Sequence, residues 1–265
     1  MDIKFLEKSD VQQIINLQPP GWDIMSIIDF YIKADFCFPF KVTNDKNIIG
    51  IGTTIIHNDV AWLAHIIVLP DYRNQGIGKL ITQTLVDKAH AEQCETIYLL
   101  ATELGEPVYK KIGFQTETEY VSFKGEKIND ALEADEYIEP YANAFRNQIS
   151  ILDQLVSGED RMFHIDQHLS SGFVCLHDND VMGYYLPTFG DGLIIAKDAV
   201  AGEALMKLRL TTKDFAVFPV ENVPATAFME KHNFTSFRTQ KRMRFGKKRD
   251  WQPANIYNRI GGNLG

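Results

Sequence analysis

The sequence predicts an α/β (α+β) protein built from two similar modules, and three observations carry this prediction. The stretch Ala61–Ala89 has the pattern of a strand, a glycine turn and a helix in succession. A hairpin of two alternating strands, Phe40–Thr43 and Ile48–Ile56, precedes it. The same order of elements recurs in the second half of the chain.

The strand, turn and helix in Ala61–Ala89 together predict an anion-binding cradle. Leu63–Leu69 is a short apolar run rich in Ile and Val, which is typical of an interior strand. After it comes the pattern R-x-x-G-x-G, which contains Gly76 and Gly78, and then a helix with apolar residues at three- and four-residue spacing. The unpaired N–H groups and the dipole at a helix start favour an anion, and glycine lets the backbone approach it.

Further motifs narrow the class of ligand. The turn lacks the G-x-G-x-x-G of dinucleotide-binding folds and the G-K-[ST] of P-loops, so both of those interpretations fail. Downstream, the sequence VYKKIGF at Val108–Phe114 predicts a short helix with a tyrosine that ends in Gly-Phe. R-x-x-G-x-G followed by Y-x-x-x-G-F resembles the GNAT superfamily of N-acetyltransferases.

This resemblance implies a fold and an activity. Each module would be a mixed, mostly antiparallel sheet flanked by helices. The activity would be acetyl-CoA-dependent transfer of an acetyl group to a primary amine of a small molecule, an amino acid or a peptide. One alternative is a non-catalytic acetyl-CoA sensor, and another is a structural or interaction protein on a retired enzyme fold. The complete R-x-x-G-x-G and the retained Tyr109 favour the enzyme.

The resemblance also implies which residues hold acetyl-CoA. The strand residues would pair with its pantetheine arm, and the glycine turn would hold its pyrophosphate through main-chain N–H groups. Thr102 stands where many relatives have Asn, so one contact differs. The expected cofactor-binding residues are Ile66, Ile67, Val68, Arg73, Asn74, Gln75, Gly76, Ile77, Gly78, Lys79 and Thr102.

Tyr109 is the expected catalytic residue, because a phenol beside the cofactor sulfur can supply a proton to the departing thiolate. The alternative is a packed aromatic side chain whose hydroxyl lies at the surface. Three aromatic residues are expected to line the acceptor pocket, with plain core packing as the alternative. They are Trp22, Tyr31 and Trp62.

The sequence leaves the general base open. His65 lies in the central strand, but strand alternation puts it on the side opposite to Trp62 and Ala64, facing a helix, unless a bulge intervenes. The remaining choices are a water molecule, Glu103, or the C-terminal carboxylate if the tail folds into the cleft.

We expect four segments: a catalytic GNAT domain at residues 1–125, a linker at 126–140, a degenerate GNAT-like domain at 141–250 and a tail at 251–265 that packs on the body. In the second module, Ala201–Met206 aligns with the glycine turn and helix start. No arginine precedes Gly202, Ala204 replaces the second glycine, and Met229 stands in the place of Tyr109. The second module should therefore be catalytically silent.

Composition limits the partners. The chain has 265 residues, of which 45% are hydrophobic, and its net charge of -8 argues against a nucleic-acid surface. Its three cysteines show no pairing motif, so neither a metal site nor a disulfide framework is predicted, and buried reduced thiols are expected. With no signal peptide and no membrane-length apolar run, a cytoplasmic protein that does not bind membranes is expected. The oligomeric state and the acceptor amine stay open.

Overall fold

The computed structural model describes residues 1–19, 24–128 and 137–265, and these residues form two compact units. Each unit combines segments from distant parts of the sequence. The first contains Met1–Glu117, Arg242–Lys248 and Gly262–Leu264, and the second contains Thr118–Lys241, Arg249–Gly261 and Gly265. The sequence analysis placed domain boundaries at residues 125, 140 and 250, and these boundaries stay predictions.

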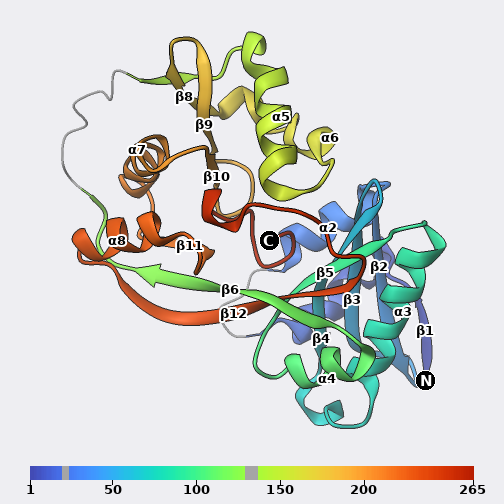
Figure 1. Ribbon diagram of the computed structural model, residues 1–265. Helices are drawn as coiled ribbons and strands as arrows, with labels where there is room; N and C mark the ends of the chain where they lie inside the picture. The colour runs from blue at the N-terminus through green and yellow to red at the C-terminus, as the bar shows by residue number, and fades with distance from the viewer. Residues whose placement is uncertain (20–23, 129–136) are drawn as a thin grey trace. The chain divides into compact units, whose positions relative to one another are not determined.

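The first unit contains a mostly antiparallel sheet in the order β1-β2-β3-β4-β5-β12-β6, to which β6 contributes Gln115–Glu117 and β12 contributes Arg242–Gly246 (Figure 1). Strands β4 and β5 pair in parallel. Strand β12 lies between β5 and β6 in this sheet, and the C-terminal end of β12 belongs to the first unit. The bounds are β1 Asp2–Phe5, β2 Cys37–Asn44, β3 Asn47–His57, β4 Val60–Val68, β5 Thr96–Ala101, β6 Gln115–Lys124 and β12 Thr235–Gly246.

Two longer helices flank the first unit's sheet. Helix α3, Ile77–Ala91, buries an apolar stripe that includes Ile81 and Leu85, as the three- and four-residue spacing predicts. Helix α2, Met25–Lys33, buries Ile28 and Tyr31. The remaining helical elements are α1 Val11–Ile14, α4 Glu106–Ile112 and the 3-10 turns Lys8–Asp10, Ile15–Leu17 and Pro70–Tyr72.

One hydrophobic cluster of the first unit lies between the sheet and α3. It joins α3 to Ala61 and Leu63 of β4 and to Ile97 and Leu99 of β5, and Ile66 and Val68 pack against it. We call the side of the sheet that carries this cluster the α3 face. Since side chains alternate along a strand, Trp62 and Tyr98 point to the opposite side, which we call the α2 face.

The second unit repeats this order of elements (Figure 1). Its five-stranded sheet has the order β13-β10-β9-β8-β7, and β6 pairs with β11. In sequence order β7 to β11 correspond to β1 to β5, and α7 and α8 correspond to α3 and α4. The strands are β7 Ile138–Pro140, β8 Phe173–His177, β9 Asp180–Leu186, β10 Leu193–Ala196, β11 Phe215–Pro219 and β13 Ile256–Asn258. The helices are α5 Arg146–Ser157, α6 Met162–Ile165, α7 Ala199–Leu210, α8 Val223–Lys231 and the 3-10 turns Asn143–Phe145, Leu169–Ser171 and Pro253–Asn255.

The second unit also contains a buried ion pair beside its hydrophobic core. Arg161 donates two hydrogen bonds to Asp153, of 3.0 and 2.9 Å, and the Tyr184 hydroxyl donates to the same carboxylate. All three side chains are buried, and the core around α7 includes Leu205 and Phe218. The predicted fold class, two sheets flanked by helices with a repeated order of elements, is confirmed.

Candidate functional site

The start of α3 has the geometry of an anion-binding cradle. Gly76 is its N-cap residue, with a left-handed φ of 84°, and no side chain caps the helix. A Cβ built on Gly76 would meet nothing within 4 Å, so the backbone faces open space. Asn74, Gln75, Gly76 and Lys79 are all exposed. The first N–H groups of α3 are therefore available to an anionic ligand.

Two side chains of the glycine turn donate hydrogen bonds to nearby main-chain carbonyls. Arg73 donates from Nε to the carbonyl of Val68 at 3.2 Å, and Gln75 donates to the carbonyl of Asp71 at 3.1 Å. The guanidinium of Arg73 thus fixes the turn to the end of the strand that is expected to bind pantetheine. This contact gives Arg73 a role in shaping the turn.

Strands β4 and β5 pair only along their first residues. The parallel register joins Val60, Ala61 and Trp62 to Thr96, Ile97 and Tyr98, and both strands continue beyond it. Ile66, Ile67 and Val68 lie in this continuing part of β4, next to the cradle. The structure thus brings the three strand residues and the glycine turn together, as the sequence predicts, while their binding role stays a prediction.

A β-bulge in β4 changes the interpretation of His65. Gly52 of β3 lies opposite two residues of β4, because the register runs from Ile51–Ile67 to Thr53–Ala64. His65 is the extra residue and has a φ of 48°. The alternation shifts there, so that His65 lies on the α2 face with Trp62 and Ala64. The expectation that His65 lies on the side opposite to Trp62 is therefore wrong, and the bulge is the physical reason.

His65 contacts helix α2 on this face. The Tyr31 hydroxyl lies 3.1 Å from His65 Nδ1, and the two rings are 5.6 Å apart. Burial lowers the pKa of His65 to about 4, because an imidazolium would lose hydration there. The ring is therefore neutral at physiological pH.

Tyr109 is buried at the base of α4. Its ring packs 6.1 Å from Phe114 and folds over Gly105, where a Cβ would lie 2.6 Å from the ring. Burial raises the pKa of the Tyr109 hydroxyl to about 12, so the phenol keeps its proton at neutral pH. A phenol in this state can donate a proton.

The other predicted residues have different surroundings. Thr102 accepts the N–H of Gly105 with its hydroxyl at 3.3 Å and helps to start α4. Trp62 is buried, with its ring 5.2 Å from the ring of Tyr98 and 5.1 Å from Cζ of Arg242. Tyr31 is buried on α2, and Trp22 lies outside the described residues. Whether these side chains line an acceptor pocket stays a prediction.

The corresponding helix start in the second unit is closed. Asp198 is the N-cap of α7, and its carboxylate accepts the N–H of Ala201 at 2.9 Å. The alignment of Gly202 with the glycine turn is therefore wrong, because α7 already begins at Ala199 and Gly202 lies inside the helix. Gly202 is needed for packing instead, since a Cβ there would run into the ring of Tyr257.

The C-terminal tail contributes a strand to the second unit. Strand β13 pairs antiparallel with β10, through Ile194–Asn258 and Ile195–Ile256. On the β11 side, the Arg259 N–H donates to the Val217 carbonyl at 2.9 Å. Strand β13 thus lies between β10 and β11, the counterparts of β4 and β5. This segment of the tail is thus built into the sheet of the second unit.

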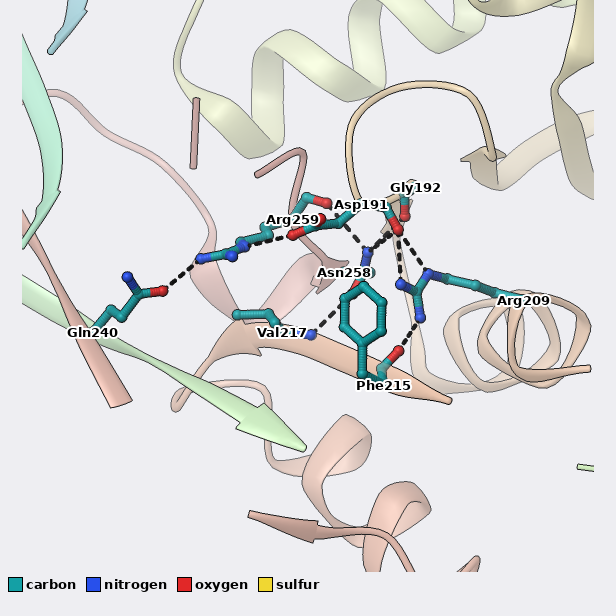
Figure 2. Close-up of polar contacts among 8 residues, drawn as sticks. All are labelled: Asp191, Gly192, Arg209, Phe215, Val217, Gln240, Asn258 and Arg259. Carbon is teal, nitrogen blue, oxygen red and sulfur yellow. Dashed lines mark hydrogen bonds and ion pairs between the residues drawn. The ribbon is translucent and has the colours of Figure 1, made fainter. Parts of the chain in front are cut away.

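Asn258 is the centre of this attachment, as Figure 2 shows. Its side chain is fully buried, accepts the Val217 N–H at 2.9 Å and donates to the Gly192 carbonyl at 2.7 Å. The guanidinium of Arg209 donates to the Asp191 carbonyl at 3.1 and 2.7 Å and also to the Phe215 carbonyl. Arg259 bonds to the Asp191 carboxylate at 3.0 Å and to Gln240 at 2.8 Å. These polar contacts hold the tail strand in register.

Sequence reasoning missed two residues of the tail, Asn258 and Asn263. Neither lies in a recognisable motif, and both act through partners far away in sequence. The only signal in the sequence was the apolar content of the tail, which predicts packing but not its location.

Comparison with known proteins gives one family match and several structural likenesses. Residues 9–114 match the acetyltransferase (GNAT) family. An acetyltransferase-like protein from Pyrococcus horikoshii is similar in structure over 100% of this chain and 95% of its own, with a TM-score of 0.83 and 19% identity. A tandem GNAT protein from the clavulanic acid biosynthesis pathway is similar over 94% and 100%, with a TM-score of 0.64 and 12% identity. A GCN5-related N-acetyltransferase from Anabaena variabilis is similar over 92% of this chain and 72% of its own, with a TM-score of 0.60 and 13% identity. No match to a curated protein was found.

The match to the acetyltransferase (GNAT) family thus lies within the N-terminal segment of the first unit. Because the structural likeness extends over the whole chain, the complete fold is that of a tandem GNAT protein. The family uses acetyl-CoA as co-substrate and acetylates amines.

The structure also bears on the cysteines, on metal ions and on membrane-spanning helices. Cys37, Cys94 and Cys175 are buried, as expected from the sequence. Within the described residues, no group of His, Cys, Asp and Glu side chains is arranged to hold a metal ion. In the same part of the chain, none of the helices combines the length and apolarity that a membrane span requires.

Proposed function

We propose that the first unit is an acetyl-CoA-dependent N-acetyltransferase acting on a primary amine of a small molecule, an amino acid or a peptide. The observation that carries this proposal is the open start of α3, where Gly76 has a left-handed backbone and no side chain caps the helix. Every α-helix leaves its first N–H groups without a partner inside the helix, and at α3 the open space around Gly76 keeps them accessible. A diphosphate is a natural ligand for them.

The residues present fit acetyl-CoA. The main-chain N–H groups from Asn74 to Lys79 would hold the pyrophosphate, because Gly76 puts no Cβ into the open space there. Ile66–Val68 would pair with the pantetheine arm as another strand would, beyond the point where β4 and β5 stop pairing. Bound there, acetyl-CoA supplies the thioester carbon that the amine attacks.

Tyr109 would act as the general acid. When the new C–N bond forms, the C–S bond breaks and the sulfur leaves as a thiolate, which needs a proton or a hydrogen bond. The buried Tyr109 hydroxyl has a pKa of about 12 and is protonated at neutral pH, so it can donate. The amine proton would pass to water, because the neutral His65 has a pKa of about 4 and is a weak proton acceptor.

The second unit would bind no coenzyme. Asp198 already occupies its helix start with a carboxylate, and β13 already occupies the position between β10 and β11. We therefore expect one acetyl-CoA for each chain.

The test is calorimetry of the full chain with acetyl-CoA, followed by a panel of amines assayed for thiol release. The panel should include small amines, amino-acid amides and peptides with a free N-terminus. One-to-one binding and thiol release with at least one amine are expected. Binding without release from any amine would indicate the sensor instead, and absence of binding would contradict both. A stoichiometry of two would show that the second unit is also occupied.

A further inference from the structure

The N-cap residue of α4, Gly105, lies directly against the ring of Tyr109 in the same helix. A Cβ built on Gly105 would lie 2.6 Å from Cε2 of this ring, and 2.9 Å from both Cζ and the hydroxyl oxygen. Heavy atoms of a packed interior do not approach so closely, so with a larger residue at position 105 the ring or the turn would have to move. The observed position of the Tyr109 hydroxyl therefore depends on the missing Cβ.

The backbone conformation at this position does not require glycine. Gly105 has a φ of -83° and a ψ of -33°, which are right-handed helical values that any L residue adopts. Gly76 and Gly113, at other helix ends, instead have left-handed φ values of 84° and 116°. A glycine at position 105 thus provides room for the ring and not freedom for the main chain.

The second unit has the opposite combination of residues at the equivalent positions. In both α4 and α8 the phenylalanine five residues further on donates its N–H to the carbonyl of the compared residue, at 3.1 Å for Tyr109 and 2.9 Å for Met229. Four residues before this pair of counterparts stand Gly105 in the first unit and Ala225 in the second. Ala225 and Met229 are both fully buried in the core around α7. The Cβ is thus present in the unit that lacks the aromatic ring and absent in the unit that has it.

Packing contacts hold the Tyr109 ring in place. The side chain is 8% exposed, and its ring lies 6.1 Å from the ring of Phe114. In the part of the chain that the structure describes, the Tyr109 hydroxyl makes no hydrogen bond that could fix it independently. The position of the hydroxyl is therefore set by the shape of its neighbours, and Gly105 is the neighbour at the hydroxyl end of the ring.

Tyr109 also belongs to the hydrophobic cluster that reaches the candidate site. The same cluster contains Ile77, the first residue of α3 after the glycine turn, and Ala101, the last residue of β5. Val68, at the end of β4, packs against this cluster. The ring is thus packed together with side chains from the strand and the helix start that are expected to bind the coenzyme.

We propose that Gly105 is a positioning residue for acetyl transfer, which by lacking a Cβ lets the Tyr109 ring lie against the first turn of α4 and so sets the point from which the hydroxyl donates to the departing sulfur. The inference rests on the proposed role of Tyr109 as general acid. Gly105 itself touches no reacting atom and acts only through the ring of Tyr109.

The displacement that a Cβ would impose sets the size of the expected effect. Carbon atoms in contact lie about 3.5 Å apart, so a Cβ at 2.6 Å requires the ring to move by about 1 Å. A misplacement of about 1 Å can cost roughly a hundredfold in rate, because a general acid donates only over hydrogen-bond distance. Gly105→Ala should therefore lower kcat for the amine that releases thiol by at least about tenfold, with an unchanged Kd for acetyl-CoA.

The double variant Gly105→Ala/Tyr109→Phe separates positioning from a general disturbance of α4. A phenylalanine ring meets the same Cβ but has no hydroxyl to misplace, so kcat should equal that of Tyr109→Phe alone. Gly262→Ala is the matched control and should keep its kcat, because a Cβ on Gly262 meets nothing within 4 Å. An unchanged kcat in Gly105→Ala, or a second fall of similar size in the Tyr109→Phe background, would overturn the proposal.

Urea denaturation of the full chain tests the packing without any substrate. Gly105→Ala should lower the denaturation midpoint by about 0.5 M, because overpacking destabilises a core. Tyr109→Met gives the first unit the residue that the second unit has, and in this background the same alanine substitution should cost much less. An equal cost in both backgrounds, or no cost in either, would mean that the Cβ does not meet the ring and would refute the proposal.

The two experiments fail separately. If Gly105→Ala does not fold while Gly105→Ala/Tyr109→Met does, the dependence of the ring on Gly105 is supported by folding alone. If no amine releases thiol, the proposed acetyl transfer fails, and with it the catalytic purpose of Gly105. The urea comparison still decides in that case whether Gly105 sets the position of the Tyr109 ring.

Discussion

The starts of α3 and α7 occupy equivalent places in the two units and differ in how their first N–H groups are satisfied. In α3 the N-cap is Gly76, which has no side chain that could accept the first N–H groups. In α7 the N-cap is Asp198, whose carboxylate accepts the Ala201 N–H at 2.9 Å. One residue type thus separates a helix start that can receive an anion from one that supplies its own.

The strands beside these helices show the same difference. Pairing of β4 with β5 stops after Trp62 and Tyr98, whereas β13 continues the second unit's sheet on the free side of β10. A peptide strand therefore lies where a pantetheine arm is expected to lie in the first unit. The comparison shows how a repeated fold can be kept while a binding site is replaced by internal contacts of the chain.

The largest effect that should separate the two units is on the turnover number kcat, and it is expected at Tyr109 of the first unit. Tyr109→Phe removes the hydroxyl that is proposed to protonate the thiolate, so kcat should fall on the order of a hundredfold or more. Kd for acetyl-CoA, measured by calorimetry, should barely change. Tyr137→Phe is the control, because Tyr137 is exposed in the second unit. Full activity in Tyr109→Phe would assign this residue to packing alone.

The next effect should be on coenzyme binding. Gly76→Asp gives α3 the carboxylate that α7 already has, and the charge would oppose a pyrophosphate at the same N–H groups. Kd for coenzyme A should rise roughly tenfold to a hundredfold, since like charges a few ångströms apart repel by a few kcal/mol. Val200→Asp is the counterpart in the first turn of α7, at a residue 77% exposed, and should leave Kd unchanged. Equal affinity in Gly76→Asp and the unaltered chain would remove the cradle assignment.

A smaller effect, on stability alone, is expected at Asn258. Asn258→Ala leaves the buried Val217 N–H without its acceptor and the Gly192 carbonyl without its donor. Such a loss typically costs about 2 kcal/mol in the free energy of unfolding, which urea denaturation measures. Asn147→Ala, on the exposed face of α5, should stay within about 0.5 kcal/mol. A change at Asn258 no larger than that of the control would mean that the tail strand is held by its backbone alone.

Local patterns predicted most of the fold, because the signals for strands, turns and helices lie within a few residues. The predicted strand Thr96–Ala101 is β5 with the same bounds, and the hairpin matches β2 and β3. The glycine turn was found because R-x-x-G-x-G is contiguous. Contacts between residues far apart in the sequence leave no comparable local pattern, so they could not be predicted.

The sequence-based errors have specific physical causes. His65 was placed on the wrong side of its strand because a bulge adds one residue without a sequence marker. Gly202 was aligned with the turn because both are glycines, although its role is to admit the ring of Tyr257. The hydrogen bond between Asn263 and Tyr31 could not be predicted, because the two residues are more than two hundred positions apart in the sequence.

The smallest expected effect concerns Asp198, the N-cap residue that distinguishes α7 from α3. Asp198→Ala removes the side-chain cap of α7 and should lower the free energy of unfolding by about 1 kcal/mol, the usual value for an N-cap. The helix start would then resemble that of α3 in its unsatisfied N–H groups. Coenzyme stoichiometry in Asp198→Ala should nevertheless remain one, because β13 still lies between β10 and β11. A second bound coenzyme in this variant would show that the cap alone closes the second unit, and that the tail strand gives way to the ligand.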